Sequence, residues 1–117
     1  MATSASLSMS PFTLKDNLMK ILALEKDIPG VTAEQFRPHL RDEAAQVWEL
    51  TQTGQLREIY FRQDRHAAVL VLECETVEDA ERLLATLPLV RHGLIEFEII
   101  PLAPYPGFAR LFAEERG

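Results

Sequence analysis

Two short segments of this chain are apolar at every position, and they constrain the fold more than any other feature of the sequence. They run from Ile21 to Leu24 and from Val69 to Leu72. Because successive side chains of a strand point to opposite faces of a sheet, each segment needs cover on both faces. The two segments therefore predict central strands, at residues 19–26 and 66–74.

Two further segments, residues 56–62 and 94–100, alternate between apolar and polar or charged side chains. This alternation is typical of strands with one mixed face, so we expect both at the edges of the sheet. The segment Gln63–Arg65 is polar and predicts a turn that joins residues 56–62 to residues 66–74 as a hairpin.

The first helix is expected between the first two strands. Thr32 and Gln35 form a capping-box pattern, and Gly54 predicts the end of the helix. Pro38 lies several residues past the cap and predicts a kink near the start. Between these signals, apolar residues recur at three- and four-residue spacing: Phe36, Leu40, Ala44, Val47 and Leu50.

A second helix is expected after residue 74. Thr76 with Asp79 three residues later is a capping pattern, and Pro88 is expected to end the helix. Its inward side chains share the same helical spacing and are Ala80, Leu83, Leu84 and Leu87.

The resulting order is strand, helix, strand, strand, helix, strand, the split βαβ arrangement of ferredoxin-like domains. It predicts an α+β fold with a four-stranded antiparallel sheet, the first and third strands in the middle, and two helices on one face. A length of 117 residues suits one domain. We expect it at residues 19–103, between an N-terminal arm at residues 1–18 and a C-terminal arm at residues 104–117.

The second face of this sheet needs a cover, because two helices can cover only one. Leaving several Leu, Val and Ile side chains in water costs roughly 1.5–3 kcal/mol each, against a total stability of about 5–15 kcal/mol. We expect a homodimer in which two sheets face each other. The alternative is that the arms of the chain cover this face. The C-terminal arm is itself apolar, with Tyr105, Phe108, Leu111 and Phe112.

Leu87-Pro88-Leu89 follows the second helix, and the last strand contains Glu96-Phe97-Glu98-Ile99-Ile100 and continues into Pro101-Leu102 and a proline-bearing tail. With the order of elements, residues 19 to about 110 resemble the muconolactone isomerase-like family of the dimeric α/β-barrel superfamily. The resemblance implies two sheets facing each other across a dimer axis and a cleft for a small organic acid, lactone or similar ligand. It supplies no catalytic residue by position.

Composition excludes several functions. The net charge of -6 and the pI near 5.0 argue against nucleic acid or anionic lipid as a partner, because both need clustered Lys and Arg. No apolar run approaches the roughly 20 residues that cross a bilayer, and the first eighteen residues do not resemble a signal peptide. Cys74 is the one cysteine, so no intramolecular disulfide can form, and a reducing cytoplasm is the expected location.

The first candidate site is a polar set on the open faces and ends of the strands. Glu25 ends the first strand, and alternation places Glu58, Tyr60 and Arg62 on one face of the second. A carboxylate in an apolar cavity could act as a general base, while Arg and Tyr could bind a substrate carboxylate or stabilise an enolate. The alternative is that these side chains are solvated, or buried in a dimer interface.

The histidines form the second candidate set. His39 and Glu43 are four residues apart on the first helix, His66 opens the third strand, and His92 precedes the fourth. Histidine is easily poised near neutral pH, so His39 could be a base. No HxH, HExxH or cysteine pair is present, so we expect no metal. The alternative is surface or capping histidines.

Two single residues complete the candidates. Cys74 ends an apolar strand and is expected to be a buried thiol rather than a nucleophile. Trp48 lies beside the inward stripe of the first helix, so it either borders a cleft or packs against the sheet or the tail. The glycine patterns that cradle nucleotide phosphates are absent, and no cofactor is expected.

Two functions therefore stand beside each other. One is a cofactor-independent isomerase or proton-transfer enzyme acting on a small carbonyl or lactone compound, with Glu25 or His39 as base and Tyr60 with Arg62 as anchors. Trp48, Glu58, His66 and His92 would line its substrate site. The other is a non-catalytic module that binds a small ligand or assembles. A lined internal pocket with convergent polar groups would favour the enzyme.

Overall fold

The computed structural model describes residues 18–113, so nearly all of the predicted N-terminal arm lies outside the described residues. Its sheet contains β1 (Met19–Asp27), β2 (Leu56–Phe61), β3 (Ala68–Cys74) and β4 (Ile95–Pro101). The strand order is β2-β3-β1-β4, and all neighbouring strands are antiparallel. The predicted ferredoxin-like α+β fold, with the first and third strands in the middle, is confirmed.

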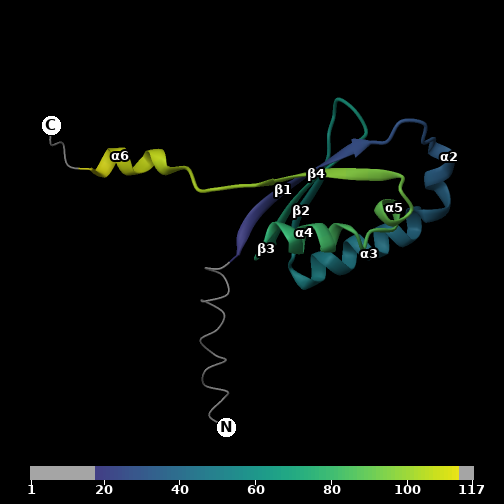
Figure 1. Ribbon diagram of the computed structural model, residues 1–117, viewed down its shortest axis with the longest axis horizontal. Coiled ribbons are helices and arrows are strands. Elements are labelled where there is room, and N and C mark those ends of the chain that lie inside the picture. Colours follow the sequence, from purple (N-terminus) through teal and green to yellow (C-terminus); the bar gives the residue numbers. More distant parts are fainter. Residues whose placement is uncertain (1–17, 114–117) are drawn as a thin grey trace, which may run out of the picture.

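The helices are α2 (Ala33–Phe36), the 3-10 helix η1 (Arg37–His39), α3 (Leu40–Thr53), α4 (Val77–Leu84), α5 (Pro88–Arg91), the 3-10 helix η2 (Pro106–Phe108) and α6 (Ala109–Phe112). Figure 1 shows α3, α4 and α5 together on one side of the sheet. In the part of the chain that the structure describes, no helix covers the other side of the sheet. No helix within residues 18–113 is both long and apolar enough to cross a bilayer.

The signals at the start and end of the first helix act as predicted. The Gln35 side chain accepts a hydrogen bond from the Thr32 backbone N–H at 2.8 Å, and Pro38 lies in η1, which separates α2 from α3. Gly54 follows α3 with a φ of 89°, a left-handed conformation that other residues rarely adopt. The predicted kink therefore takes the form of a 3-10 turn.

The second helix is shorter than predicted. The Thr76 hydroxyl accepts the Asp79 backbone N–H at 3.0 Å, as expected of an N-cap, but α4 ends at Leu84. Pro88 does not end this helix; it begins α5, another turn of helix. A proline is tolerated there because the first helical position needs no N–H donor.

The two faces of the sheet differ in cover. On the side of the helices, Ile21 and Ala23 of β1 and Leu70 and Leu72 of β3 are at most 1% exposed. On the other side, Leu22 pairs with Val71 and Leu24 with Val69, and these four side chains are only half-buried. We call these the covered face and the open face.

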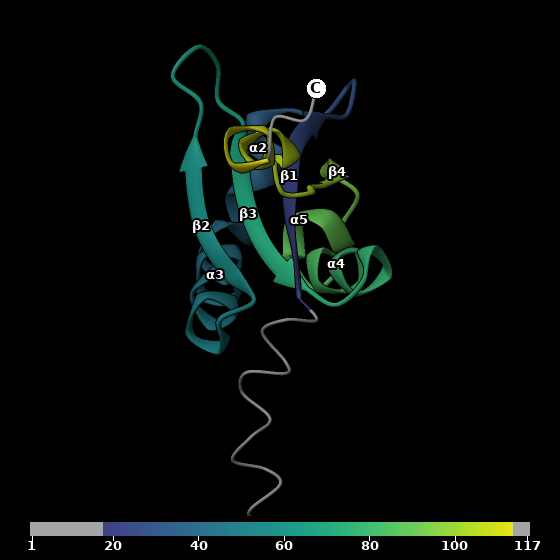
Figure 2. The same cartoon turned by 90° about the vertical axis from the view of Figure 1, so that its left-hand side faces the viewer.

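The C-terminal segment leaves the sheet after β4. Figure 1 shows it running away from the body to η2 and α6, and in Figure 2 α6 is seen end-on. Four of its large side chains are 64–83% exposed: Tyr105, Phe108, Leu111 and Phe112. Within the described residues, the C-terminal segment therefore does not cover the open face.

Candidate functional site

A cavity of about 510 Å³ lies between α3 and the covered face of the sheet. This volume is in the range of small-molecule sites. α3 lines it with one stripe at helical spacing: Leu40, Glu43, Ala44, Val47, Trp48 and Thr51. All four strands contribute the opposite wall: Glu25, Ile59, Phe61, Ala68, Leu70, Ile95 and Phe97. Phe36, His66, Leu87 and Leu89 complete the lining.

Glu25 is the one buried charged residue that the structure describes, with 8% of the residue exposed. It follows the last β1–β3 pair, Leu24 with Val69, and its Oε1 accepts the Ala68 backbone N–H at 2.7 Å. Alternation along β1 places it with Ile21 and Ala23 on the covered face. Glu25 at the end of β1 and the pair Glu58 and Tyr60 on β2, which the sequence groups as one candidate site, therefore lie on opposite faces of the sheet.

Glu43 is a second carboxylate in the lining of the cavity. Its Oε1 accepts the Leu89 backbone N–H at 2.9 Å, which ties α3 to α5. Burial raises the pKa of Glu43 above its ordinary value, the hydrogen bond from Leu89 opposes this rise, and the negative charge of Glu25 adds to it. Two carboxylates thus face one largely apolar cavity, and each is held by a backbone donor.

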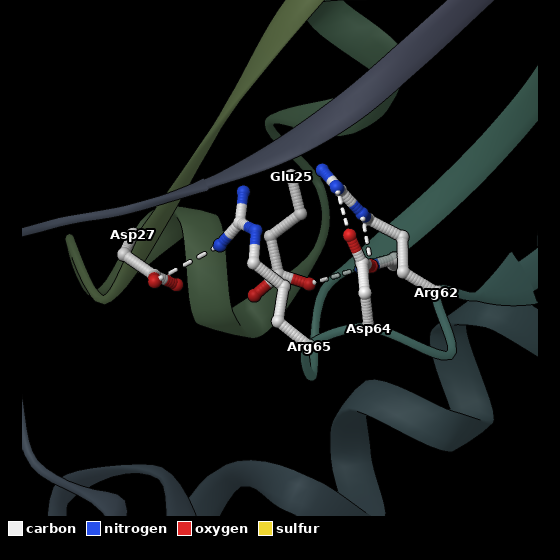
Figure 3. Close-up of polar contacts among 6 residues, drawn as sticks. Glu25, Asp27, Arg62, Asp64 and Arg65 are labelled. Atoms are coloured by element: carbon white, nitrogen blue, oxygen red, sulfur yellow. Dashed lines mark hydrogen bonds and ion pairs between the residues drawn. The ribbon is translucent and has the colours of Figure 1, made fainter.

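The loop between β2 and β3 forms one border of the cavity. Figure 3 shows it beside Glu25, with Arg62 bonded to Asp64 and Arg65 bonded to Asp27 at the end of β1. The Arg62–Asp64 contacts are 2.6 and 2.8 Å, and the Arg65–Asp27 contact is 3.2 Å. The Arg62–Asp64 pair lies within the loop, and the Arg65–Asp27 pair connects the loop to β1. His66, which lines the cavity, lies in this loop rather than in β3 and contacts the Phe61 ring, with centroids 4.5 Å apart.

Three of the eight predicted site residues line the cavity: Glu25, Trp48 and His66. Glu58 and Tyr60 lie on the opposite face of β2, where the Tyr60 hydroxyl donates to Glu58 at 2.9 Å and this bond raises the pKa of Tyr60. The alternation of β2 is thus confirmed, but this polar set is turned away from the cavity. Arg62 is engaged by Asp64, which lowers the pKa of that carboxyl.

The remaining histidines form a contact of their own. His39 in η1 and His92 after α5 stack with ring centroids 4.1 Å apart, and neither lines the cavity. His39 therefore lies outside the cavity that Glu43 lines, and Glu43 is bonded to Leu89. Within residues 18–113, no three His, Cys, Asp or Glu side chains are grouped closely enough to hold a metal ion.

Trp48 and Cys74 differ in burial: the tryptophan is exposed and the cysteine is buried. Trp48 is 63% exposed, so it borders the cleft, and the expectation that it packs against the sheet or the tail is wrong. Cys74 is buried as predicted, and burial raises the pKa of its thiol, which keeps the sulfur protonated and unreactive at neutral pH.

One comparison with known proteins found a family match. A sequence model described as muconolactone delta-isomerase matches residues 18–107. The chain belongs to the muconolactone delta-isomerase family. No curated protein matches the sequence at a significant level. The matched range includes every residue that lines the cavity, from Glu25 to Phe97.

Glu43 lines the cavity, although in the sequence it stands out only as a neighbour of His39. It lies three residues after Leu40 and four before Val47, within the inward stripe, and a charged residue in an apolar stripe is the signal that could have singled it out. A charged residue in such a stripe leaves water only when it has a partner, and the half-buried Glu43 has the backbone of Leu89.

Proposed function

We propose that this protein is a cofactor-independent isomerase that moves a proton, and with it a double bond, in a small unsaturated lactone or related carbonyl compound. The observation that carries the proposal is the pair Glu25 and Glu43 in an apolar cavity of about 510 Å³, in a chain of the muconolactone delta-isomerase family. A lined pocket with convergent polar groups favours an enzyme over a non-catalytic binding or assembly module.

Glu43 is assigned to carry the proton. A general base works best when its pKa is near the working pH, and burial together with the charge of Glu25 moves the pKa of Glu43 in that direction. The carboxylate would take a proton from the γ-carbon of an α,β-unsaturated lactone and leave a dienolate. It would then return the proton to the α-carbon, which restores the Glu43 carboxylate and moves the double bond to the β,γ position.

Glu25 and His66 have supporting roles in this scheme. Glu25, held by the Ala68 N–H, sets the negative field that keeps Glu43 basic. His66 lies at the border of the same cavity and can donate a ring N–H to the oxygen on which the enolate charge develops. Trp48, Phe61 and Phe97 supply apolar walls that hold the ring of a lactone.

Turnover of a panel of unsaturated lactones tests this function. Glu43→Gln keeps an acceptor for the Leu89 N–H but removes the proton carrier, so kcat should fall by roughly 10²- to 10⁴-fold. Glu25→Gln should lower kcat less and shift the pH profile toward lower pH, because it removes a charge that raises the pKa of Glu43. Glu58→Gln, on the open face, is the matched control and should leave turnover unchanged. Equal rates in all four proteins would contradict the proposal.

We also propose that the working unit is a homodimer formed by the open faces of two sheets. The half-buried Leu22, Leu24, Val69 and Val71 support it, and so does the exposed C-terminal segment, which would reach the partner. An isologous contact of this kind should bury upwards of roughly 2,000 Å² in total. Sedimentation velocity at low micromolar concentration should give a dimer. A folded, unaggregated monomer under these conditions would rule it out.

A further inference from the structure

A second cavity of about 380 Å³, which we call the outer cavity, adjoins the main cavity between α3 and the sheet. Four side chains line both cavities and therefore form the boundary between them: Glu25, Phe36, Leu40 and His66. The outer cavity is also lined by Asp27 and Arg37, whose side chains are exposed to solvent. It thus offers a second route from solvent to the main cavity, besides the mouth beside the exposed Trp48.

The boundary side chains are held to different degrees. Glu25 is buried and accepts the Ala68 N–H. Phe36 packs against a buried cluster, and Leu40 belongs to α3. His66 instead lies in the exposed loop between β2 and β3. It is therefore the part of the boundary that can move without disturbing the core.

The base of this loop is fixed. The Arg62 N–H donates to the Ala67 carbonyl at 2.9 Å, directly after the last residue pair of β2 and β3. Ala67 is fully buried, whereas residues 62–66 are exposed. A movement of the loop about this base would carry His66 with it and leave the sheet in place.

An ion pair connects the exposed part of the loop to the end of β1. Arg65 Nη1 lies 3.2 Å from Asp27 Oδ2, and Figure 3 shows this contact. The pair of Arg62 with Asp64, by contrast, lies within the loop. The side chains of Arg65 and Asp27 are 43% and 72% exposed. Ion pairs as exposed as this are weak and are screened by salt, so the contact can break and re-form readily.

We infer that residues 62–66 form a gate between the outer and main cavities, and that the Arg65–Asp27 pair is its latch. While the pair is formed, His66 stands at the boundary and closes the passage. When the pair breaks, the loop moves about its base and takes His66 out of the passage. A weak latch suits this role, because the loops that admit ligands must open on timescales of seconds or less. The gate acts on any molecule that enters the main cavity, whether or not it reacts there, so the inference goes beyond the proposed reaction.

The experiment measures, by stopped flow, how fast the full chain takes up and releases the uncharged probe N-phenylnaphthylamine, which fluoresces in apolar surroundings. Trp48 is the one tryptophan of the sequence and lines the main cavity, so energy transfer from it reports probe bound there. Ala44→Phe fills part of the same cavity and should remove this signal. Arg65→Gln should raise the association and dissociation rates together, each about three- to fivefold, because the latch is a weak exposed pair. Its Kd should stay the same, because a gate opens for entry and exit alike.

Three comparisons identify the latch. Arg62→Gln breaks the pair within the same loop and should leave both rates within about 1.5-fold of the wild-type values. The double variant Asp27→Arg with Arg65→Asp exchanges the charges, restores an ion pair and should return both rates toward wild type. Sodium chloride at about 0.5 M should raise both rates of the wild-type protein but leave those of Arg65→Gln unchanged, because that variant has no latch to screen. Circular dichroism checks that each variant is folded.

The outcomes separate the gate from its alternatives and from the isomerase. Unchanged rates in Arg65→Gln would overturn the inference and place ligand entry at the mouth beside Trp48. A change in the dissociation rate alone would also overturn it, because Arg65 would then be a ligand contact. A probe signal that is absent, or that Ala44→Phe does not remove, overturns it too, since no main cavity would then be occupied. If the rates respond as expected but no lactone is turned over, the gate stands and the isomerase falls.

Discussion

The covered and open faces of the sheet come from the same strands and nearly the same side chains, yet they behave differently. On β3, Leu70 and Leu72 face the helices and are at most 1% exposed, while Val69 and Val71, which alternate with them, are half-buried on the open face. The difference lies in what is placed above each face. Apolar character alone therefore does not determine burial, because cover comes from other elements.

Carboxylates on the two faces show the same contrast in their burial and in their hydrogen-bond partners. Glu25 on the covered face is buried and accepts a backbone N–H at 2.7 Å, and it lines a cavity. Glu58 on the open face is exposed and accepts the Tyr60 hydroxyl at 2.9 Å. A glutamate is thus a candidate catalytic group on the covered face and a solvated surface group on the open face. The helices above the covered face make this difference.

The largest effect should come from removing packed volume on the covered face. Leu72 is fully buried, so Leu72→Ala should lower the free energy of unfolding by about 2–5 kcal/mol, from lost burial and from the cavity left behind. Val71→Ala, one residue earlier on the open face, should cost less than about half as much. Urea denaturation of the two variants measures this. Equal costs would mean that the open face is covered as tightly as the other.

The open face should respond to charge through assembly rather than folding. Val69→Lys places an ammonium group within the proposed dimer contact, where a charge buried without a partner costs several kcal/mol. We expect the dimer dissociation constant to rise at least roughly a hundredfold. Sedimentation equilibrium follows the dissociation, and circular dichroism checks that the monomer stays folded. An unchanged constant would place the dimer contact elsewhere.

The sequence predicted the elements and their order because these depend on local signals. Thr32 with Gln35, Thr76, Gly54 and Pro38 each act within a few residues, and the structure confirms what each one predicted. Pro88 shows the limit. A proline can follow the end of one helix or begin the next, so Pro88 does not by itself show where α4 ends. The length of α4 depends on its packing against the rest of the domain, which neighbouring residues in the sequence do not reveal.

The site was predicted only in part, because the residues that meet in it depend on which face of each strand the helices cover. Where both faces of a strand are apolar, as in β1, alternation cannot tell which one the helices cover, so the sequence does not separate Glu25 from Glu58 and Tyr60, which lie on the other face. His66 was assigned to a strand but lies in the loop beside the cavity. Glu43 needs a partner from α5, 46 residues away, which its own neighbourhood does not reveal.

Glu43 gives the covered face a pH dependence. Its pKa is raised in the folded protein above the ordinary 4.5, so between these two values the folded state binds more protons than the unfolded state. Stability linked to this group is present below about pH 4.5 and is lost as the pH rises through the raised pKa. Glu43→Gln removes this loss, so its Tm should gain on that of the wild-type protein from pH 4 toward pH 7. Thermal melts across this range measure the gain. Glu58→Gln is the control, and a difference in Tm that falls with pH would contradict the assignment.

The smallest effect should come from the polar pair of the open face. Tyr60→Phe removes the hydroxyl that Glu58 accepts, but both side chains are exposed, so water replaces the lost contact and Tm should stay within experimental error. Turnover should also be unchanged, and so should the change in Trp48 fluorescence on lactone binding, because Tyr60 points away from the cavity that Trp48 lines. Phe61, the next residue on β2, lines the cavity, so Phe61→Ala should weaken the binding of an unsaturated lactone, measured by titration of the Trp48 fluorescence. A loss of turnover in Tyr60→Phe with an unchanged Tm would instead show that the open face takes part in the chemistry, as it could if the dimer encloses a second site there.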